Sequence, residues 1–114
     1  MYQDLALYID GEFVKGGGRR EQDVINPATQ EVLGKLPHAS TADLDRALAA
    51  AQRAFDSWKK TSPLERAKIL RRVGELTRER AKEIGRNITL DQGKPLAEAV
   101  AEVMICAEHA DWHA

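Results

Sequence analysis

Residues 62–95 read SPLERAKILRRVGELTRERAKEIGRNITLDQGKP, and this stretch decides the fold. It opens on a strong helix-start signal. The Ser62 hydroxyl can accept a backbone N–H of the first turn, and Glu65 can reach back to the Ser62 N–H. Pro63 at the first helical position loses only a donor that would have no partner there. The pattern therefore predicts that a helix begins at residue 63.

The same stretch carries a helical period and a clear stop. Its apolar side chains recur every three or four residues, which gathers them on one stripe: Leu64, Ala67, Leu70, Val73, Leu76, Thr77, Ala81, Ile84 and Ile88. Gly93 can take the left-handed conformation that ends a helix, and Pro95 can begin the next one. The sequence predicts one helix over residues 63–90, with its stripe packed against another part of the protein.

Composition excludes several classes of protein. The 114 residues hold 17 basic and 18 acidic side chains, so no strong field favours nucleic acid or an anionic membrane as a partner. Cys106 is the single cysteine, which rules out an internal disulfide framework. No run approaches the ~20 apolar residues that span a bilayer. A soluble protein of the cytoplasm is expected.

Residues 1–37 predict short β-hairpins. Asp10-Gly11 suits a two-residue hairpin turn, and it stands between two short apolar-rich segments. The glycines at 16–18 precede two arginines, but no helix opens behind them, so a flexible exposed turn is favoured over a phosphate-binding loop. Two further strands are expected between residue 23 and Pro37.

From Ser40 the period changes from two to 3.6, which predicts a helix over residues 40–58 with Ser40 or Thr41 as its cap. Its apolar positions share one face: Leu44, Ala47, Leu48, Ala51, Ala54, Phe55 and Trp58. Two readings of Phe55 and Trp58 are a cofactor-binding box and core packing. Core packing is favoured, because both aromatics lie on the apolar stripe.

The last predicted helix covers residues 96–114. It places Cys106, His109 and His113 at spacings of three and four, so all three could ligate zinc from one side. A fourth ligand is not evident, and the competing reading is a small apolar cysteine with two surface histidines. Cys106 as a nucleophile lacks a neighbouring base or positive charge.

This last helix reaches Ala114 in full amphipathic register, without a glycine, a proline or a basic last turn to close it. The pattern predicts that the helix belongs to a longer protein. No glycine loop between strand and helix and no Ser-His-Asp arrangement is found in the sequence, so no catalytic centre is predicted within it.

Five motifs in one order give a family resemblance. They cover nearly the whole sequence: Leu7–Phe13, Val24–Thr29, Ala47–Trp58, Pro63–Arg72 and Thr89–Pro95. In order and spacing they resemble the N-terminal part of NAD(P)-dependent aldehyde dehydrogenases. The segment from Thr89 to Ala99 looks most like the succinate-semialdehyde branch. Gln30 departs from a glycine that the family often has, so its turn is expected to form without a positive φ angle.

The resemblance implies an α/β fold with a Rossmann-like cofactor domain. Residues 1–114 would be the N-terminal portion of that domain, with the catalytic domain absent. The nucleophilic cysteine, the general base and the residues that grip NAD or NADP would lie beyond Ala114. In the parent enzyme a cysteine thiolate attacks the aldehyde, hydride passes to the nicotinamide and water releases the acid. A homo-oligomer is also implied.

One functional feature of the family falls on this sequence. Many members hold sodium or potassium between backbone carbonyls before the Asn-Pro pair and the aspartate of the Leu-Asp-x-Gly-Lys-Pro turn. Those positions match Val24, Ile25 and Asp91. Hard oxygen ligands with one formal charge suit a monovalent ion. The alternative is that Asp91 only fixes its turn.

Three hypotheses follow for the function. The first is an N-terminal segment of an aldehyde dehydrogenase, inert by itself, whose partner is the rest of the dehydrogenase chain. The second is a separate helical module that binds another protein through its apolar stripes. The third is a small metal protein that uses Cys106, His109 and His113.

Overall fold

A computed structural model describes residue 2 and residues 4–114; residues 1 and 3, which fall in the expected β region, lie outside the described part. The chain folds as two units. The first takes in the chain up to Ile25 together with Glu31–Lys60, and the second takes in Asn26–Gln30 together with Thr61–Ala114. Two small antiparallel hairpins and four helices confirm the expected α/β character.

The first unit contains both hairpins. Strands β1 (Leu7–Ile9) and β2 (Glu12–Val14) pair antiparallel around the predicted Asp10-Gly11 turn. Both turn residues take positive φ angles, 55° and 83°, as a tight two-residue turn requires. Strands β3 (Glu21–Ile25) and β4 (Val32–Pro37) form the second antiparallel pair. The short hairpins that the sequence predicts over residues 1–37 are therefore found in this unit.

The connection from β3 to β4 differs from expectation at one residue. Gln30 takes a positive φ of 62°, so the prediction of a turn without a positive φ is wrong. The turn compensates with hydrogen bonds: the Gln30 N–H donates to the Asn26 carbonyl at 2.8 Å, and the Asn26 side-chain oxygen accepts from the Ala28 N–H at 2.9 Å. These bonds hold a left-handed conformation that a glycine adopts without strain.

Helix α1 (Thr41–Trp58) completes the first unit. Ser40 is its cap, as one of the two predicted alternatives. The expected packing of its stripe is not found within the described residues: Leu48 is 70% exposed, and Phe55 and Trp58 are 54% and 46% exposed. Asp43 is instead the buried residue of this helix. The stripe periodicity predicted the helix correctly, and the hydrogen bonds from α1 to the first hairpin come from Arg46 and Arg53, which lie outside the stripe.

The second unit corrects the prediction of one helix over residues 63–90. The stretch forms α2 (Pro63–Glu79) and α3 (Ala81–Gln92), which are separated at Arg80. Arg80 has φ −102° and ψ 10°, outside the helical region. Its N–H still donates to the Leu76 carbonyl, so the chain changes direction without losing that hydrogen bond. The apolar period of the sequence continues across Arg80, so the sequence pattern does not reveal the break between the two helices.

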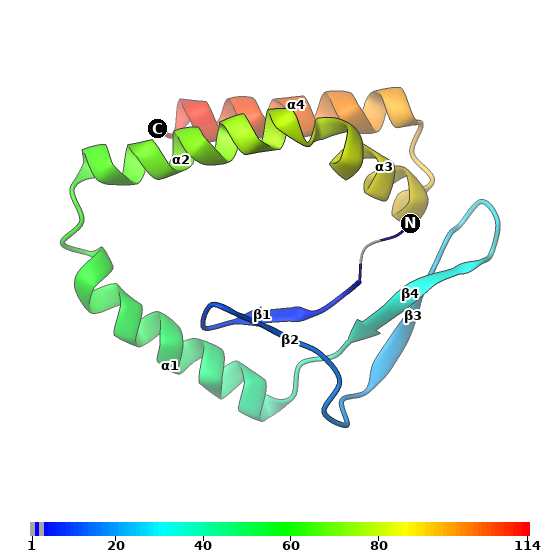
Figure 1. The fold of residues 1–114 in the computed structure, drawn as a ribbon, viewed down its shortest axis with the longest axis horizontal. Coiled ribbons are helices and arrows are strands. Elements are labelled where there is room, and N and C mark those ends of the chain that lie inside the picture. The colour runs from blue at the N-terminus through cyan, green and yellow to red at the C-terminus, as the bar shows by residue number, and fades with distance from the viewer. Residues whose placement is uncertain (1, 3) are drawn as a thin grey trace. The chain divides into compact units, whose positions relative to one another are not determined.

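Helix α4 (Leu96–Trp112) packs on α2 and α3 and runs antiparallel to α2 (Figure 1). Two glycines mark the closest approaches. A Cβ atom on Gly85 would lie 2.7 Å from the Val100 side chain and 3.1 Å from its backbone nitrogen. A Cβ atom on Gly74 would lie 3.2 Å from the Ala107 carbonyl oxygen. The helices therefore pack backbone against backbone, which only small residues allow.

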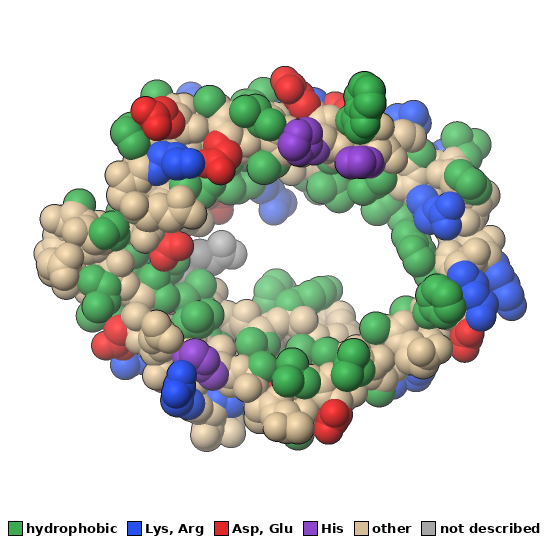
Figure 2. Space-filling model, turned by 180° about the vertical axis from the view of Figure 1, so that it is seen from behind, with side chains coloured by type: hydrophobic (Ala, Val, Ile, Leu, Met, Phe, Trp, Pro, Cys, Tyr) green, Lys and Arg blue, Asp and Glu red, His purple; other side chains and the backbone are tan. Residues whose placement is uncertain are grey.

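The core is made of small side chains. Among the described residues the buried apolar ones are Ile9, Pro37, Ala67, Ala81, Ala99, Val103 and Ala107, and no large side chain is fully buried. Many large apolar groups reach the surface of the helices instead (Figure 2). Leu64 and Val73, which were predicted to face the core, are 63% and 46% exposed. Among the described residues no helix is long and apolar enough to cross a membrane.

Candidate functional site

The most strongly held charges lie in the first unit, between the glycine turn and the start of α1. The Arg19 Nε and a terminal nitrogen donate to the two Asp43 carboxylate oxygens at 3.0 and 2.6 Å. The Ser40 N–H and hydroxyl add bonds of 2.9 and 2.8 Å to the same carboxylate. The Arg19 guanidinium, followed by the Ser40 donors, holds the pKa of the Asp43 carboxyl well below its usual range.

This cluster also fixes the glycine turn. Gly16, Gly17 and Gly18 all have positive φ angles, and the third Arg19 nitrogen donates to the Gly16 carbonyl at 2.6 Å. Arg19 is therefore fully engaged by protein groups, and its side chain is only 16% exposed. An anion would have to displace a buried carboxylate to reach it. The cluster is a structural anchor that joins the glycine turn to the start of α1.

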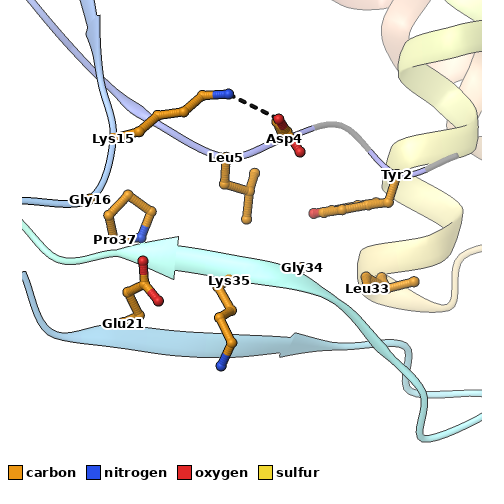
Figure 3. Close-up of a pocket in the computed structure, with 10 residues that line it drawn as sticks. All are labelled: Tyr2, Asp4, Leu5, Lys15, Gly16, Glu21, Leu33, Gly34, Lys35 and Pro37. Atoms are coloured by element: carbon orange, nitrogen blue, oxygen red, sulfur yellow. Dashed lines mark hydrogen bonds and ion pairs between the residues drawn. The ribbon is translucent and has the colours of Figure 1, made fainter.

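A shallow cavity of about 250 Å³ lies elsewhere in the first unit (Figure 3). Both of its lysines are paired: Lys15 with Asp4 at 2.9 Å, and Lys35 with Asp23 at 2.9 Å. The hydrogen bond to Asp23 raises the pKa of Lys35, which keeps the amine protonated. No nucleophile stands beside a base among the residues that line this cavity.

The predicted ion ligands come from both units. Val24 and Ile25 are the last residues of β3, where the register with β4 shifts. Asp91 lies in the last turn of α3 and is exposed, and its carboxylate makes no hydrogen bond or ion pair with any residue that the structure describes. The turn itself is closed by the Gly93 N–H, which donates to the Thr89 carbonyl at 2.9 Å. Asp91 is thus not needed to fix the turn.

The zinc hypothesis for α4 gains nothing from the structure. Cys106, His109 and His113 are all exposed on one helix. Within the described part of the chain, no group of three or more histidine, cysteine or acidic side chains is arranged to hold a metal ion. Asp111 of the same helix is taken up by an ion pair with Arg78 of α2 at 2.5 Å.

Sequence reasoning missed the Arg19–Asp43 pair and the conformation of Gln30. The pair joins residues 24 apart in the chain, and no local pattern signals such a contact. A signal for half of it existed: Ser40 and Asp43 stand at capping-box spacing, which predicts a buried first-turn carboxylate. The Gln30 conformation was signalled by the same family pattern that places a glycine there.

Comparison with known proteins shows which family has this architecture. The aldehyde dehydrogenase family model matches residues 13–114. The rat mitochondrial methylmalonate-semialdehyde/malonate-semialdehyde dehydrogenase [acylating] is 45% identical over 109 residues, which cover 93% of this chain and 20% of the relative. The chain thus spans about a fifth of the length of the curated relatives it matches.

Solved structures agree with the sequence relatives. Lactaldehyde dehydrogenase from Escherichia coli superposes with a TM-score of 0.91 at 37% identity, over 98% of this chain and 24% of that one. A betaine aldehyde dehydrogenase mutant from Staphylococcus aureus, in complex with NAD+, gives 0.81 at 35% identity, over 93% and 23%. Both are oxidoreductases that act on aldehydes. The chain belongs to the aldehyde dehydrogenase family, and the fold predicted from the resemblance is confirmed.

Proposed function

We propose that this chain is the N-terminal portion of the cofactor-binding domain of an NAD(P)-dependent aldehyde dehydrogenase, with residues 1–114 as a scaffold. The observation that carries the proposal is the coverage. Nearly the whole chain superposes on lactaldehyde dehydrogenase, yet it accounts for only 24% of that enzyme. A segment that matches one quarter of an enzyme from end to end is best explained as the same quarter of a similar enzyme.

The substrate class that we favour is a short aldehyde with a carboxylate at its other end. Relatives from rat and human, 45% and 44% identical, are named for methylmalonate and malonate semialdehydes. The sequence resemblance favours succinate semialdehyde, which has the same two functional groups. All three substrates share the aldehyde carbonyl that the enzyme oxidises, so the class is proposed ahead of the individual compound.

The described residues support a scaffold role and not a reacting one. Cys106 is exposed on α4 among acidic and histidine side chains, and no described base stands by it at hydrogen-bond distance. The charges of Arg19 and Asp43 are paired with each other at 2.6 Å and are nearly buried, so neither side chain is open to a substrate. NAD or NADP, when bound to the parent, accepts the hydride. The contribution of this chain is to hold its hairpins and helices in place beside the groups that do the chemistry.

A sodium or potassium ion is proposed at Val24, Ile25 and Asp91. Two observations support it over a purely structural role for Asp91. Its carboxylate makes no bond with described residues, and the turn that it could have fixed is closed by Gly93. Carbonyl oxygens with one carboxylate match the hard, weakly charged site that a monovalent cation needs. The parent is further proposed to be cytoplasmic and homo-oligomeric.

The test is an assay of two proteins side by side. The 114-residue chain and the complete gene product are each given the three semialdehydes with NAD+ or NADP+, with and without coenzyme A as acyl acceptor. We expect reduced nicotinamide from the complete product only. Turnover by the 114-residue chain would contradict the scaffold role. A complete product without dehydrogenase activity on any aldehyde would refute the proposal.

A second candidate function is a helical protein-interaction module without catalysis. The observation in its favour is the exposure of large apolar side chains on both units, such as Leu48 and Leu64 at 70% and 63%. The two functions differ in what covers those side chains. An interaction module binds another protein as a complete 114-residue product, whereas the proposed scaffold requires the rest of a dehydrogenase.

A further inference from the structure

The turn between β1 and β2 carries the only Asp-Gly step of the sequence, Asp10-Gly11. An aspartate followed by glycine is the pair most prone to isomerise, because no Cβ shields the next amide nitrogen from the aspartate side chain. Both residues are exposed, and a Cβ built on Gly11 would meet nothing within 4 Å. No other part of the first unit therefore crowds a reaction between the two residues.

The hydrogen bonding of the turn leaves the reacting nitrogen free. Ile9 faces Glu12 in the antiparallel register, and both turn residues have positive φ angles, as in the primed type of two-residue turn. Such a turn ties its two outer residues together and leaves the N–H of its second central residue unbonded. Accordingly, the Gly11 N–H donates to no group that the structure describes. It can lose its proton to solvent, as an attacking nitrogen must.

An ion pair from α1 holds the side chain of the turn. The Arg53 guanidinium donates to the Asp10 carboxylate at 2.8 Å, and the two side chains are 63% and 51% exposed. The carboxyl group has to leave Arg53 before its carbon can bond to the Gly11 nitrogen. An exposed ion pair is weak, so it slows this departure without preventing it.

We propose that Asp10 is a site of spontaneous isomerisation to isoaspartate, and that Arg53 limits the rate. The Gly11 nitrogen bonds to the side-chain carboxyl carbon of Asp10. One carboxyl oxygen leaves as water, with the amide proton and one proton from solvent, which closes a succinimide ring. Water then adds to the main-chain carbonyl carbon of the ring, the bond from this carbon to the nitrogen breaks, and the proton returns to solvent. The chain now continues through the former side-chain carbon at unchanged mass, and no oxidant or co-reactant is needed.

The product is incompatible with the hairpin as described. Isoaspartate adds a methylene to the main chain between β1 and β2, so a two-residue turn cannot keep Ile9 opposite Glu12. The free carboxylate now stands on the former main-chain carbon, away from the position that Arg53 binds. Isomerisation therefore removes the register of the hairpin and its ion pair with α1 together.

The test follows isoaspartate in the complete gene product during storage at neutral pH and body temperature. Peptide mapping with electron-transfer fragmentation distinguishes the two isomers of equal mass. Asp56-Ser57 is the internal control. It also joins an aspartate to a small residue, but the Ser57 N–H lies within α1, where the helical hydrogen bonds hold it. We expect isoaspartate to accumulate at Asp10 and to stay undetectable at Asp56.

Substitutions in α1 test the role of Arg53. Arg53→Ala should raise the rate at Asp10 about threefold, which is the scale of an exposed ion pair. Arg53→Lys keeps a cation within reach and should stay close to the parent rate. Arg46→Ala is the matched control, because it removes an arginine of the same helix whose bond goes to the Ile9 carbonyl and not to the carboxylate. Asp10→Glu should abolish the reaction, since its cyclisation requires a larger and less favourable ring.

Three results would contradict the proposal. The first is an absence of isoaspartate at Asp10 in the folded protein over a time in which the free peptide of residues 7–14 is largely converted. Equal rates for the parent and Arg53→Ala would overturn the role of Arg53. Equal acceleration by Arg46→Ala would overturn it too, because the cause would then be a loosened hairpin. The readout is a peptide map, so none of these results depends on dehydrogenase activity.

Discussion

Different kinds of contact stabilise the two units of the chain, each within itself. In the second unit, α4 packs on α2 and α3 through glycine and alanine, and four of its buried residues are alanines. In the first unit the buried apolar residues among those described are Ile9 and Pro37, and a carboxylate, Asp43, ties two segments together. Close packing of small side chains stabilises the helical unit, whereas hydrogen bonds between charged groups stabilise the hairpin unit. The two units should therefore fail in different ways.

The largest effect is expected from filling the closest helix contact. Gly85→Val would place a side chain where a Cβ alone already lies 2.7 Å from Val100 and within 3.2 Å of its backbone. Backbone cannot move aside as a flexible side chain can, so we expect the free energy of unfolding to fall by about 3 kcal/mol. Urea unfolding followed by circular dichroism measures the change.

Arg86→Val is the control for this substitution. It introduces the same residue at the next position of α3, on an exposed side, and should cost only about 0.5 kcal/mol through helix propensity. Equal costs at positions 85 and 86 would show that the α3–α4 contact is looser than described.

The Asp43 cluster should make the stability of the hairpin unit depend on pH. Asp43→Asn removes the charge that Arg19 and Ser40 bind, so the variant should unfold at lower urea concentration at neutral pH. The folded-state pKa of Asp43 lies below its unfolded value of about 3.9. The stabilisation is therefore fully present above pH about 4 and is lost as the pH falls through the folded-state value.

Unfolding midpoints of parent and Asp43→Asn, compared from neutral pH downward, check this sign. The two curves should converge in acid. A gap that widens as the pH falls would mean that the carboxylate is not the stabilising form.

The sequence predicts some features of the two units and misses others. Ser62, Gly93 and Asp10-Gly11 are local signals, and each marks a helix end or turn where the structure has one. The break at Arg80 and the Arg19–Asp43 pair are set by contacts between distant segments, which periodicity does not register. The stripe of α1 shows the same limit, because a pattern predicts which side is apolar but not what covers it.

The candidate site was foreseen only as far as the family pattern reaches. Val24, Ile25 and Asp91 could be selected from motif positions, whereas no residue type or spacing among them signals an ion by itself. The exposure of Ile105 and Trp112 on α4 became visible only once burial had separated the inner side of the helix from the outer one.

A smaller effect, of opposite sign, is expected at the turn between β3 and β4. Gln30 holds a φ of 62°, which costs a residue with a side chain more than it costs glycine. Gln30→Gly should raise the free energy of unfolding by about 0.5 kcal/mol, since the relief exceeds the loss of the exposed hydrogen bond from the Gln30 side chain to Pro27. Thermal unfolding measures it, and a decrease in stability would show that this hydrogen bond matters more.

The smallest effect separates the two helix starts. At α1 the capping box is complete, with Asp43 returning a bond to Ser40. At α2 Ser62 accepts from the Glu65 N–H, but the Glu65 side chain pairs with Lys68 at 2.7 Å and does not return the predicted bond. Glu65→Ala should therefore cost only about 0.3 kcal/mol.

Ser62→Ala provides the contrast, because it removes the cap itself and should cost about 1 kcal/mol. Equal effects of the two substitutions in urea titrations would mean that the box at α2 is complete in solution.

Trp112 gives the protein an optical reporter of its own. The indole ring is 86% exposed at the C-terminal end of α4. The other tryptophan, Trp58, belongs to the first unit and is 46% exposed. An indole in water emits at longer wavelength than one enclosed by apolar groups. A chain with Trp58→Phe would carry a single tryptophan, and a shift of its emission to shorter wavelength would report the binding of any protein that covers this end of α4.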